Sequence, residues 1–267
     1  MKTMTHKSVY LLSTALLLLN IKVVLAEPTL KDPQSASPVE RSLTNSVKWL
    51  RTSKEYKFLT ESIYARASKS LAEKALPATP WTVVMDVDET ILDNSAYQKN
   101  LDLTGGSFHP TTWAEWIEEE DADLVPGVAE FIQVLFEKGG LLTMVTNRDR
   151  AQDDHTWANL LKLGIPVTEQ NTCLIGRAKE DKAKIDGIEI INDKDLRRQA
   201  VTNGNASCYS TSGKRHSNFP KAEIIMQVGD NIEDFVGVTQ HDADVKSLIK
   251  KADSEYILLP NPMYGSW

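Results

Sequence analysis

The chain has 267 residues, of which 41% are hydrophobic and 25% are charged, and its formal net charge is −7. This composition is ordinary for a globular protein and excludes a disordered or fibrous chain; the length suits one domain with a small accessory lid. An acidic protein has no electrostatic basis for binding the backbone of a nucleic acid duplex, so we expect no such partner.

The first 26 residues have the pattern of a secretory signal peptide. Lys2 and Lys7 precede an almost entirely apolar run from Val9 to Leu19, and Ala26 is a small residue suited to cleavage. The run is shorter than the ~20 residues of a membrane span. We therefore expect an exported protein, periplasmic or secreted, without a stable membrane anchor, whose mature chain begins with a flexible segment over residues 27–44.

Residues 39–76 have apolar side chains near helical spacing, with charged residues between them, and Pro77 and Pro80 end this pattern. We assign residues 45–80 to the N-terminal helical part of a cap. The apolar, β-branched run Trp81–Asp86 that follows is typical of a buried parallel strand.

The rest of the chain alternates between strands and helices. Residues 93–125 are acidic and contain Gly and Pro, which predicts an irregular cap insertion into a core of residues 81–267. Further strands are predicted at 141–145, 172–175, 223–228 and 255–259, and helices at 127–138, 151–162, 193–202, 231–238 and 243–251. Apolar strands that alternate with helices predict an α/β fold with a parallel sheet covered on both faces.

Polar residues follow three of the predicted strands. Asp86 and Asp88 follow the first, Thr146 follows the second along the chain, and Asp230 follows the strand at 223–228. Each pattern alone also occurs in solvated turns. Ligands of parallel sheets bind beyond the carboxyl ends of the strands, so the conjunction of all three predicts a site at that edge.

These residue types suit phosphoryl transfer. An Asp carboxylate such as Asp86 can attack phosphorus and form an acyl phosphate, and Asp88 can protonate the leaving oxygen and later take a proton from water. Thr146 would donate a hydrogen bond to the phosphoryl group, and Lys214 would offset its charge. Asp86 and Asp230 offer carboxylates to a hard cation such as Mg²⁺.

The order of these motifs resembles the haloacid dehalogenase-like (HAD) superfamily of aspartyl-phosphate hydrolases. Residues 49–75, the motif DVDETILDNS at 86–95 and the C-terminal LPNPMYGSW at 259–267 look like the class C acid phosphatases, over roughly residues 45–267. The resemblance implies a HAD-like Rossmannoid sheet with a small, mainly helical cap. It also implies Mg²⁺ as cofactor and phosphate monoesters as substrates, including nucleoside 5′-monophosphates.

The resemblance also assigns roles to individual positions. Asp86 matches the nucleophile, Asp88 the general acid and base, Thr146 the phosphate-binding residue and Asp230 the third metal carboxylate. Asp234 completes a pattern of four aspartates and is expected to orient the metal's waters.

The expected metal-binding residues are therefore Asp86, Asp88, Asp230 and Asp234, with Asp88 binding through its backbone carbonyl. Asn147, Trp113 and Tyr264 are the expected substrate-binding residues, the two aromatic rings enclosing a substrate ring. Packing within the core or the cap is an alternative role for Trp113.

The lysine of the family pattern is harder to place. It usually lies in a Lys-x-x-Arg segment about twenty residues before the Gly-Asp. Lys214 is closer to the Gly-Asp than that, and position 217 is Ser. Lys182, Lys184 and Lys221 are rivals for this role.

Several questions stay open at this stage. Cys173 and Cys208 are the two cysteines, and export permits a disulfide between them, but the spacing does not decide whether they pair. A homodimer is compatible with the sequence. Alternative functions are another HAD phosphotransferase or an inactive storage or binding relative, although the presence of Asp86 argues against the inactive relative.

Overall fold

The computed structural model describes residues 41–178, 183–185, 188–190 and 194–267, with only the backbone of 183–185 and 188–190. The predicted signal peptide and most of the expected flexible segment lie outside the described residues. Residues Arg41–Trp267 form one unit. Within the described part of the chain, no helix has the length and apolar character that crossing a membrane would require.

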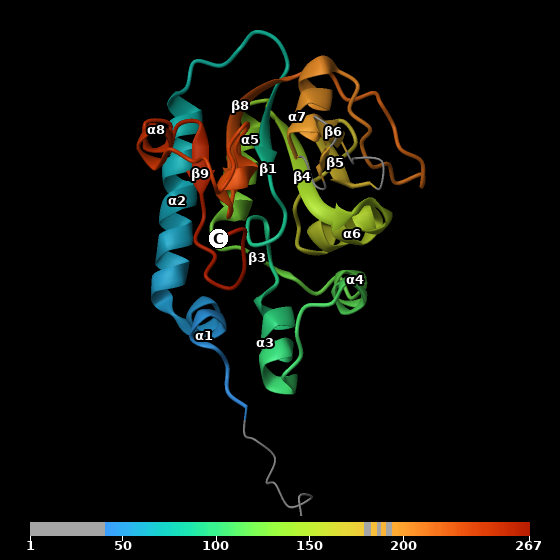
Figure 1. The fold of residues 1–267 in the computed structure, drawn as a ribbon. Coiled ribbons are helices and arrows are strands. Elements are labelled where there is room, and N and C mark those ends of the chain that lie inside the picture. Colours follow the sequence, from blue (N-terminus) through green and yellow to red (C-terminus); the bar gives the residue numbers. More distant parts are fainter. Residues whose placement is uncertain (1–40, 179–182, 186–187, 191–193) are drawn as a thin grey trace, which may run out of the picture. The chain divides into compact units, whose positions relative to one another are not determined.

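A five-stranded sheet forms the centre of this unit (Figure 1). Its order is β5-β4-β1-β8-β9, and every neighbouring pair is parallel. This confirms the predicted α/β fold. The strands are β1 (Trp81–Met85), β4 (Leu141–Asp149), β5 (Thr172–Arg177), β8 (Glu223–Gly229) and β9 (Tyr256–Leu258).

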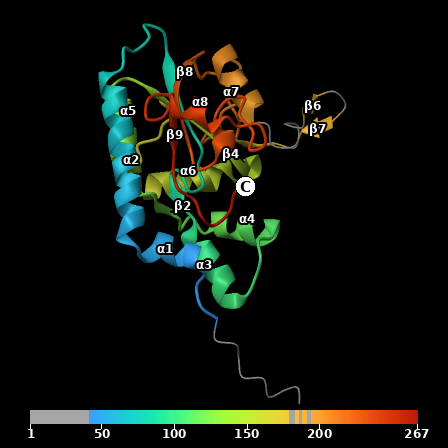
Figure 2. The same cartoon turned by 60° about the vertical axis from the view of Figure 1, so that its left-hand side comes forward.

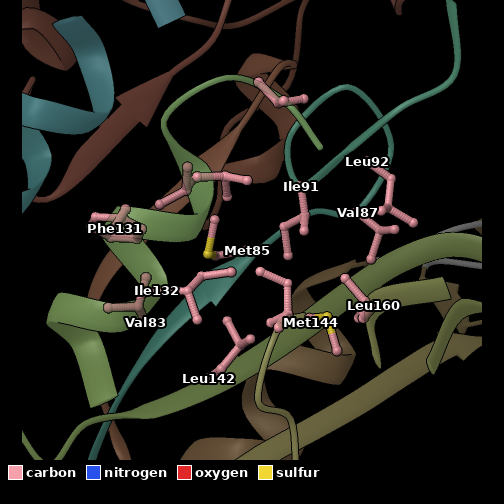
Figure 3. Packing of buried hydrophobic residues seen from close by; sticks show 14 of the residues in the cluster. Val83, Met85, Val87, Ile91, Leu92, Phe131, Ile132, Leu142, Met144 and Leu160 are labelled. Carbon is pink, nitrogen blue, oxygen red and sulfur yellow. The ribbon is translucent and has the colours of Figure 1, made fainter. Parts of the chain in front are cut away.

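Helices cover both faces of the sheet. Alternate side chains of each buried strand point to opposite faces, so both faces are apolar and each needs a layer of helices. Figure 3 shows Val83 and Met85 of β1 packed with Phe131 and Ile132 of helix α5 (Val128–Glu137). Leu160 of helix α6 (Asp153–Lys162) belongs to the same cluster.

A smaller apolar cluster lies on the opposite face. It contains Cys173 and Ile175 of β5 and Val201 of helix α7 (Lys194–Asn203). Cys173 forms a disulfide with Cys208, with 5.0 Å between the Cα atoms, which ties β5 to the loop after α7. The structure thus answers the question of pairing that the sequence left open.

The order of the strands explains why the two faces have different helices. The chain runs outward from β1 to β4 and β5 through α5 and α6, and then returns past β1 to β8 through α7. Right-handed crossovers in opposite directions place their helices on opposite faces. The carboxyl end of β1 therefore lies at the point where the direction reverses, where parallel sheets bind their ligands.

The segment at 93–125 is mainly helical, as the family resemblance implied, so the expectation of irregular structure from its composition was wrong. Two helices, α3 (Ser95–Thr104) and α4 (Pro110–Glu118), lie between β2 (Leu92–Asp93) and β3 (Asp123–Leu124), which pair antiparallel. Figures 1 and 2 both show these helices beyond the end of the sheet where β1 finishes.

The residues that suggested irregular structure are the caps of these helices. Gly105 ends α3 in the left-handed conformation, with φ of 69°. His109 and Pro110 start α4, where a proline is favoured because the first helical N–H has no partner within the helix.

The predicted N-terminal helix is two helices, α1 (Asn45–Thr52) and α2 (Lys54–Glu73). Ser53 divides them, and its hydroxyl accepts a hydrogen bond from the first turn of α2. Tyr64 and Leu71 of α2 belong to the apolar cluster of the core strands, and α2 packs along α5, whereas α1 contacts α3. Helix α2 therefore covers the core, and α1 is the helix that lies against the cap.

The helix predicted at 231–238 is only one 3-10 turn, η4 (Ile232–Asp234). Asn231 and Asp234 cap each other there, and Gly237 has a positive φ of 68°, which a helix does not permit. The remaining elements are the 3-10 turn η2 (Arg150–Gln152), the hairpin of β6 (Ala183–Ile185) and β7 (Ile188–Ile190), and helix α8 (Val245–Ile249).

Candidate active site

The site begins where β1 ends. The N–H of Asp86 donates to a carbonyl of β8 at 2.9 Å, so the sheet stays paired up to this residue. The chain then reverses after Asp88, because Glu89 adopts a φ of 54° and its N–H donates to the carbonyl of Leu92 at 2.7 Å. The buried carboxylate of Glu89 accepts the N–H of Asn94 at 2.8 Å and holds this left-handed turn in place.

Lys194, at the start of α7, is the lysine that lies beside Asp86. Its Nζ is 2.7 Å from Oδ1 of Asp86 and 2.5 Å from Oδ1 of Asp234, and its side chain is 10% exposed. Lys214 is exposed on the loop after α7, so its assignment to this position was wrong.

The rival lysines do not change this result, because Lys221 is exposed and the side chains of Lys182 and Lys184 lie outside the described part of the chain. The sequence did carry the signal: residues 194–197 read Lys-Asp-Leu-Arg, a Lys-x-x-Arg segment. It lies 36 residues before Asp230 rather than about twenty, because the long loop at 204–222 separates α7 from β8.

Three carboxylates meet at this edge of the sheet. Asp86, Asp230 and Asp234 each offer one oxygen, and these oxygens lie within 4.8 Å of one another. Gly229 permits this approach, since a Cβ there would lie 2.1 Å from Oδ2 of Asp234. Oδ2 of Asp230 accepts a hydrogen bond from Nδ2 of Asn261 at 2.8 Å. An all-oxygen set of this kind fits a hard divalent cation.

The charges in this cluster affect one another. Burial raises the pKa of Asp86 to about 6, although Lys194 opposes the shift. Burial, and then the neighbouring carboxylates of Asp86 and Asp234, hold the pKa of Asp230 well above its usual range. Burial disfavours the charge on Lys194, but the attraction of Asp234 and Asp86 outweighs it and raises the pKa of this lysine. A divalent cation would favour the ionised carboxylates.

The carboxylate of Asp88 lies outside the group of three. It is bound instead by Nε of Arg148 at 2.8 Å and by Nδ2 of Asn94 at 2.9 Å. The expectation that Asp88 binds a metal through its backbone carbonyl stays a prediction.

Thr146 is buried near the carboxyl end of β4, and its Oγ1 accepts the N–H of Arg148 at 3.1 Å. Asn147 is exposed, and its Oδ1 accepts from Nη2 of Arg197 at 3.1 Å, while Nη1 of Arg197 donates to the carbonyl of Thr146. Arg198 donates to the carbonyl of Asp234 at 3.0 Å. The first turns of α7 thus hold the ends of β4 and β8 together, a role that the sequence did not reveal.

The two predicted aromatic residues are both half-buried. The ring of Trp113 lies 5.1 Å from that of Tyr97, and Cζ of Arg148 lies 5.8 Å from its centroid, so Trp113 borders the residues that bind Asp88. Tyr264 belongs to the same C-terminal segment as Asn261, and its hydroxyl has no hydrogen-bond partner among the described residues. Their contact with a substrate stays a prediction.

Comparison with known proteins agrees with this geometry. A structure of the class C acid phosphatase from Bacillus anthracis is 26% identical over 83% of this chain and 84% of that chain, with a TM-score of 0.67. The crystal structure of the class C acid phosphatase from Bacillus anthracis with tungstate bound matches over the same shares at 26% identity, with a TM-score of 0.64.

The model of one protein family matches residues 31–267, which is most of the chain. That family is described as HAD superfamily, subfamily IIIB (acid phosphatase). The chain therefore belongs to the subfamily IIIB acid phosphatases of the HAD superfamily, hydrolases of phosphoric monoesters, and the resemblance to class C acid phosphatases is confirmed.

Proposed function

We propose that this chain is an exported, Mg²⁺-dependent acid phosphatase that forms an aspartyl-phosphate on Asp86. One observation carries the proposal: the ammonium group of Lys194 bridges Asp86 and Asp234, within the same cluster of carboxylates as Asp230. A nucleophile, a neutralising cation and an oxygen donor set for a metal therefore occupy one place.

In the first step, a carboxylate oxygen of Asp86 forms a bond to phosphorus while the bond from phosphorus to the leaving oxygen breaks. The Asp88 carboxyl gives its proton to that oxygen, so the product leaves as an alcohol. Lys194 and Thr146 offer positive charge and a hydroxyl donor to the transferring group. Mg²⁺ held by Asp86, Asp230 and Asp234 would supply further positive charge to the phosphoryl oxygens.

In the second step, water attacks the phosphorus of the aspartyl-phosphate. The Asp88 carboxylate, now without its proton, takes one from the water while the oxygen bonds to phosphorus. The bond from phosphorus to the Asp86 oxygen breaks, which releases inorganic phosphate and restores both carboxyl groups to their starting states.

Removal of divalent metal with EDTA is expected to reduce hydrolysis of 4-nitrophenyl phosphate to background, and excess Mg²⁺ should restore it. Without a cation, the three carboxylates oppose both their own ionisation and the approach of an anionic substrate. The measurement is the steady-state rate, with the metal content followed by elemental analysis. Full activity in chelator would contradict a metal mechanism, and equal restoration by Ca²⁺ would contradict the choice of Mg²⁺.

Nucleoside 5′-monophosphates are the substrates that the cap favours. The indole of Trp113 packs with Tyr97 and Phe108, at ring distances of 5.1 and 6.2 Å, and lies beside Arg148. A half-buried aromatic ring near the catalytic edge is suited to stacking on a base.

Trp113→Ala is therefore expected to raise KM for AMP by about five- to 150-fold, because stacking on a base contributes about 1–3 kcal/mol. KM for a small alkyl phosphate should change little, and this substrate is the internal control. The measurement is steady-state kinetics with both substrates. An equal change in both KM values would show that Trp113 packs the cap without contacting a nucleobase.

Export is supported by the N-terminal pattern and by the disulfide. The bond between Cys173 and Cys208 is of a kind that persists in oxidising compartments and is rare in the cytosol. We accordingly place the mature protein in the periplasm or outside the cell.

A further inference from the structure

The general acid and base candidate, Asp88, is held through one of its two oxygens. Nε and Nη2 of Arg148 each lie 2.8 Å from Oδ1 of Asp88, and Nδ2 of Asn94 lies 2.9 Å from the same atom. Among the residues that the structure describes, no hydrogen bond reaches Oδ2. One oxygen is thus fixed by three donor atoms, and the other is left for proton transfer.

Both donors are themselves rigidly held. Arg148 is 2% exposed, and its Nη1 donates to Oγ1 of Thr156 on α6 at 3.2 Å. Its Nη2 also lies 3.2 Å from Oδ1 of Asn94. Buried polar networks in which every member is paired hold their side chains in one arrangement.

Asn94 connects this arrangement to the cap. Its Oδ1 accepts a hydrogen bond from Nε1 of Trp116 on α4 at 2.8 Å, and its N–H donates to Glu89 at 2.8 Å. Asn94 is fully buried and Trp116 is 9% exposed, so these bonds are shielded from water. A cap helix is therefore joined to the proton-transferring carboxyl through a single amide side chain.

We propose that Arg148 and Asn94 are positioning residues that turn Oδ2 of Asp88 toward the leaving oxygen, and that Trp116 ties this arrangement to the cap. The inference rests on the proposed function, since it concerns the proton that Asp88 transfers in both steps. Orientation of this kind matters because proton transfer requires the donor within hydrogen-bond reach of the reacting oxygen.

The test uses two substrates that differ in their need for a proton. 4-Nitrophenolate leaves readily as an anion, whereas an alkoxide leaves only with a proton from the general acid. For Arg148→Gln, we expect kcat/KM to fall by about 100-fold or more for an alkyl phosphate, and by less than about tenfold for 4-nitrophenyl phosphate. Arg148→Lys keeps the charge but not the contact through two nitrogen atoms. Its kcat/KM for the alkyl phosphate should lie between the values of wild type and Arg148→Gln.

A second readout is the hydrolysis of the aspartyl-phosphate, a step that follows departure of the leaving group. Water attack on the aspartyl-phosphate also needs Asp88, so Arg148→Gln should accumulate phosphoenzyme from 4-nitrophenyl phosphate. We expect a burst of 4-nitrophenol close to one equivalent per enzyme, with acid-stable phosphate trapped on the protein. A role confined to the stability of the fold would produce neither the burst nor the difference between substrates.

Arg215→Gln is the matched control. Arg215 pairs with the buried Asp153, with Nη1 2.7 Å from Oδ2, and neither residue contacts Asp88. This variant should lower Tm while leaving the ratio of the two kcat/KM values unchanged. If Arg148→Gln does not fold, Trp116→Phe removes the indole N–H while keeping an aromatic ring, and should lower kcat/KM for the alkyl phosphate alone, by about two- to tenfold.

The outcomes separate this inference from the proposed function. A wild-type protein that hydrolyses neither substrate with Mg²⁺ would overturn the proposed function itself. A wild-type protein that hydrolyses both, with an equal loss on both substrates and no burst in Arg148→Gln or Trp116→Phe, would overturn only the positioning role.

Discussion

Asp86→Asn is expected to lower turnover by on the order of 10⁴-fold or more, because the reaction then lacks its nucleophile. The amide has nearly the same volume as the carboxylate, and its oxygen can still accept a hydrogen bond from Lys194. The fold should therefore be retained, with Tm within a few degrees of wild type. The measurements are steady-state rates and acid-quench trapping of phosphoenzyme, which should be absent from the variant.

The matched control is Asp242→Asn, which changes a carboxylate with a side chain 78% exposed and should have wild-type rates. Asp88→Asn offers a sharper contrast, because it retains the nucleophile and should still form phosphoenzyme from 4-nitrophenyl phosphate. Trapped phosphate on the Asp86→Asn protein would show that another residue is the nucleophile.

Lys194→Met is expected to lower kcat/KM by about 100- to 1,000-fold, in the range found when a preorganised charge donor is removed. Among the residues that the structure describes, the ammonium group of Lys194 is the cation that contacts both Asp86 and Asp234. Its loss leaves two buried carboxylates without their shared partner. Breaking a buried ion pair in this way costs about 3–5 kcal/mol of stability. Rates with saturating Mg²⁺ measure the first effect, and the free energy of unfolding in urea after removal of metal with EDTA measures the second.

Lys214→Met is the matched control for this prediction, because Lys214 is exposed on the loop after α7. It should keep wild-type activity and stability. Lys194→Gln offers a second variant that retains a donor if Lys194→Met does not fold. Loss of activity in Lys214→Met together with a fully active Lys194→Met would refute the role given to Lys194.

Much of the framework could be read from local patterns. Each strand of the sheet is a run of apolar residues, and each ends near a polar residue whose place follows from the chain direction alone. Asp86 and Asp230 were located in this way, because a carboxyl group directly after a buried parallel strand has only one edge of the sheet to occupy. The burial of Thr146 at the end of β4 follows from the same argument.

Other features depended on contacts between residues far apart in the chain. Lys194 and Asp86 are separated by 108 residues, and the Lys-x-x-Arg segment that contains Lys194 does not have the expected spacing from Asp230. The same holds for Arg148 and Asp88, 60 residues apart, and for the disulfide of Cys173 and Cys208. The positions of the two short cap helices could not be read from the local pattern, since their Gly and Pro residues serve equally in loops and at helix ends.

The sequence by itself determined the α/β class, the buried strands and the aspartates that follow them, because a strand's burial and a side chain's place at its end are set within a few residues. Only the tertiary structure decided which lysine contacts Asp86 and which side chains hold Asp88. These choices depend on how α7, β4 and the cap pack against one another, and the energy of a buried ion pair is realised only once that packing has brought its two charges together.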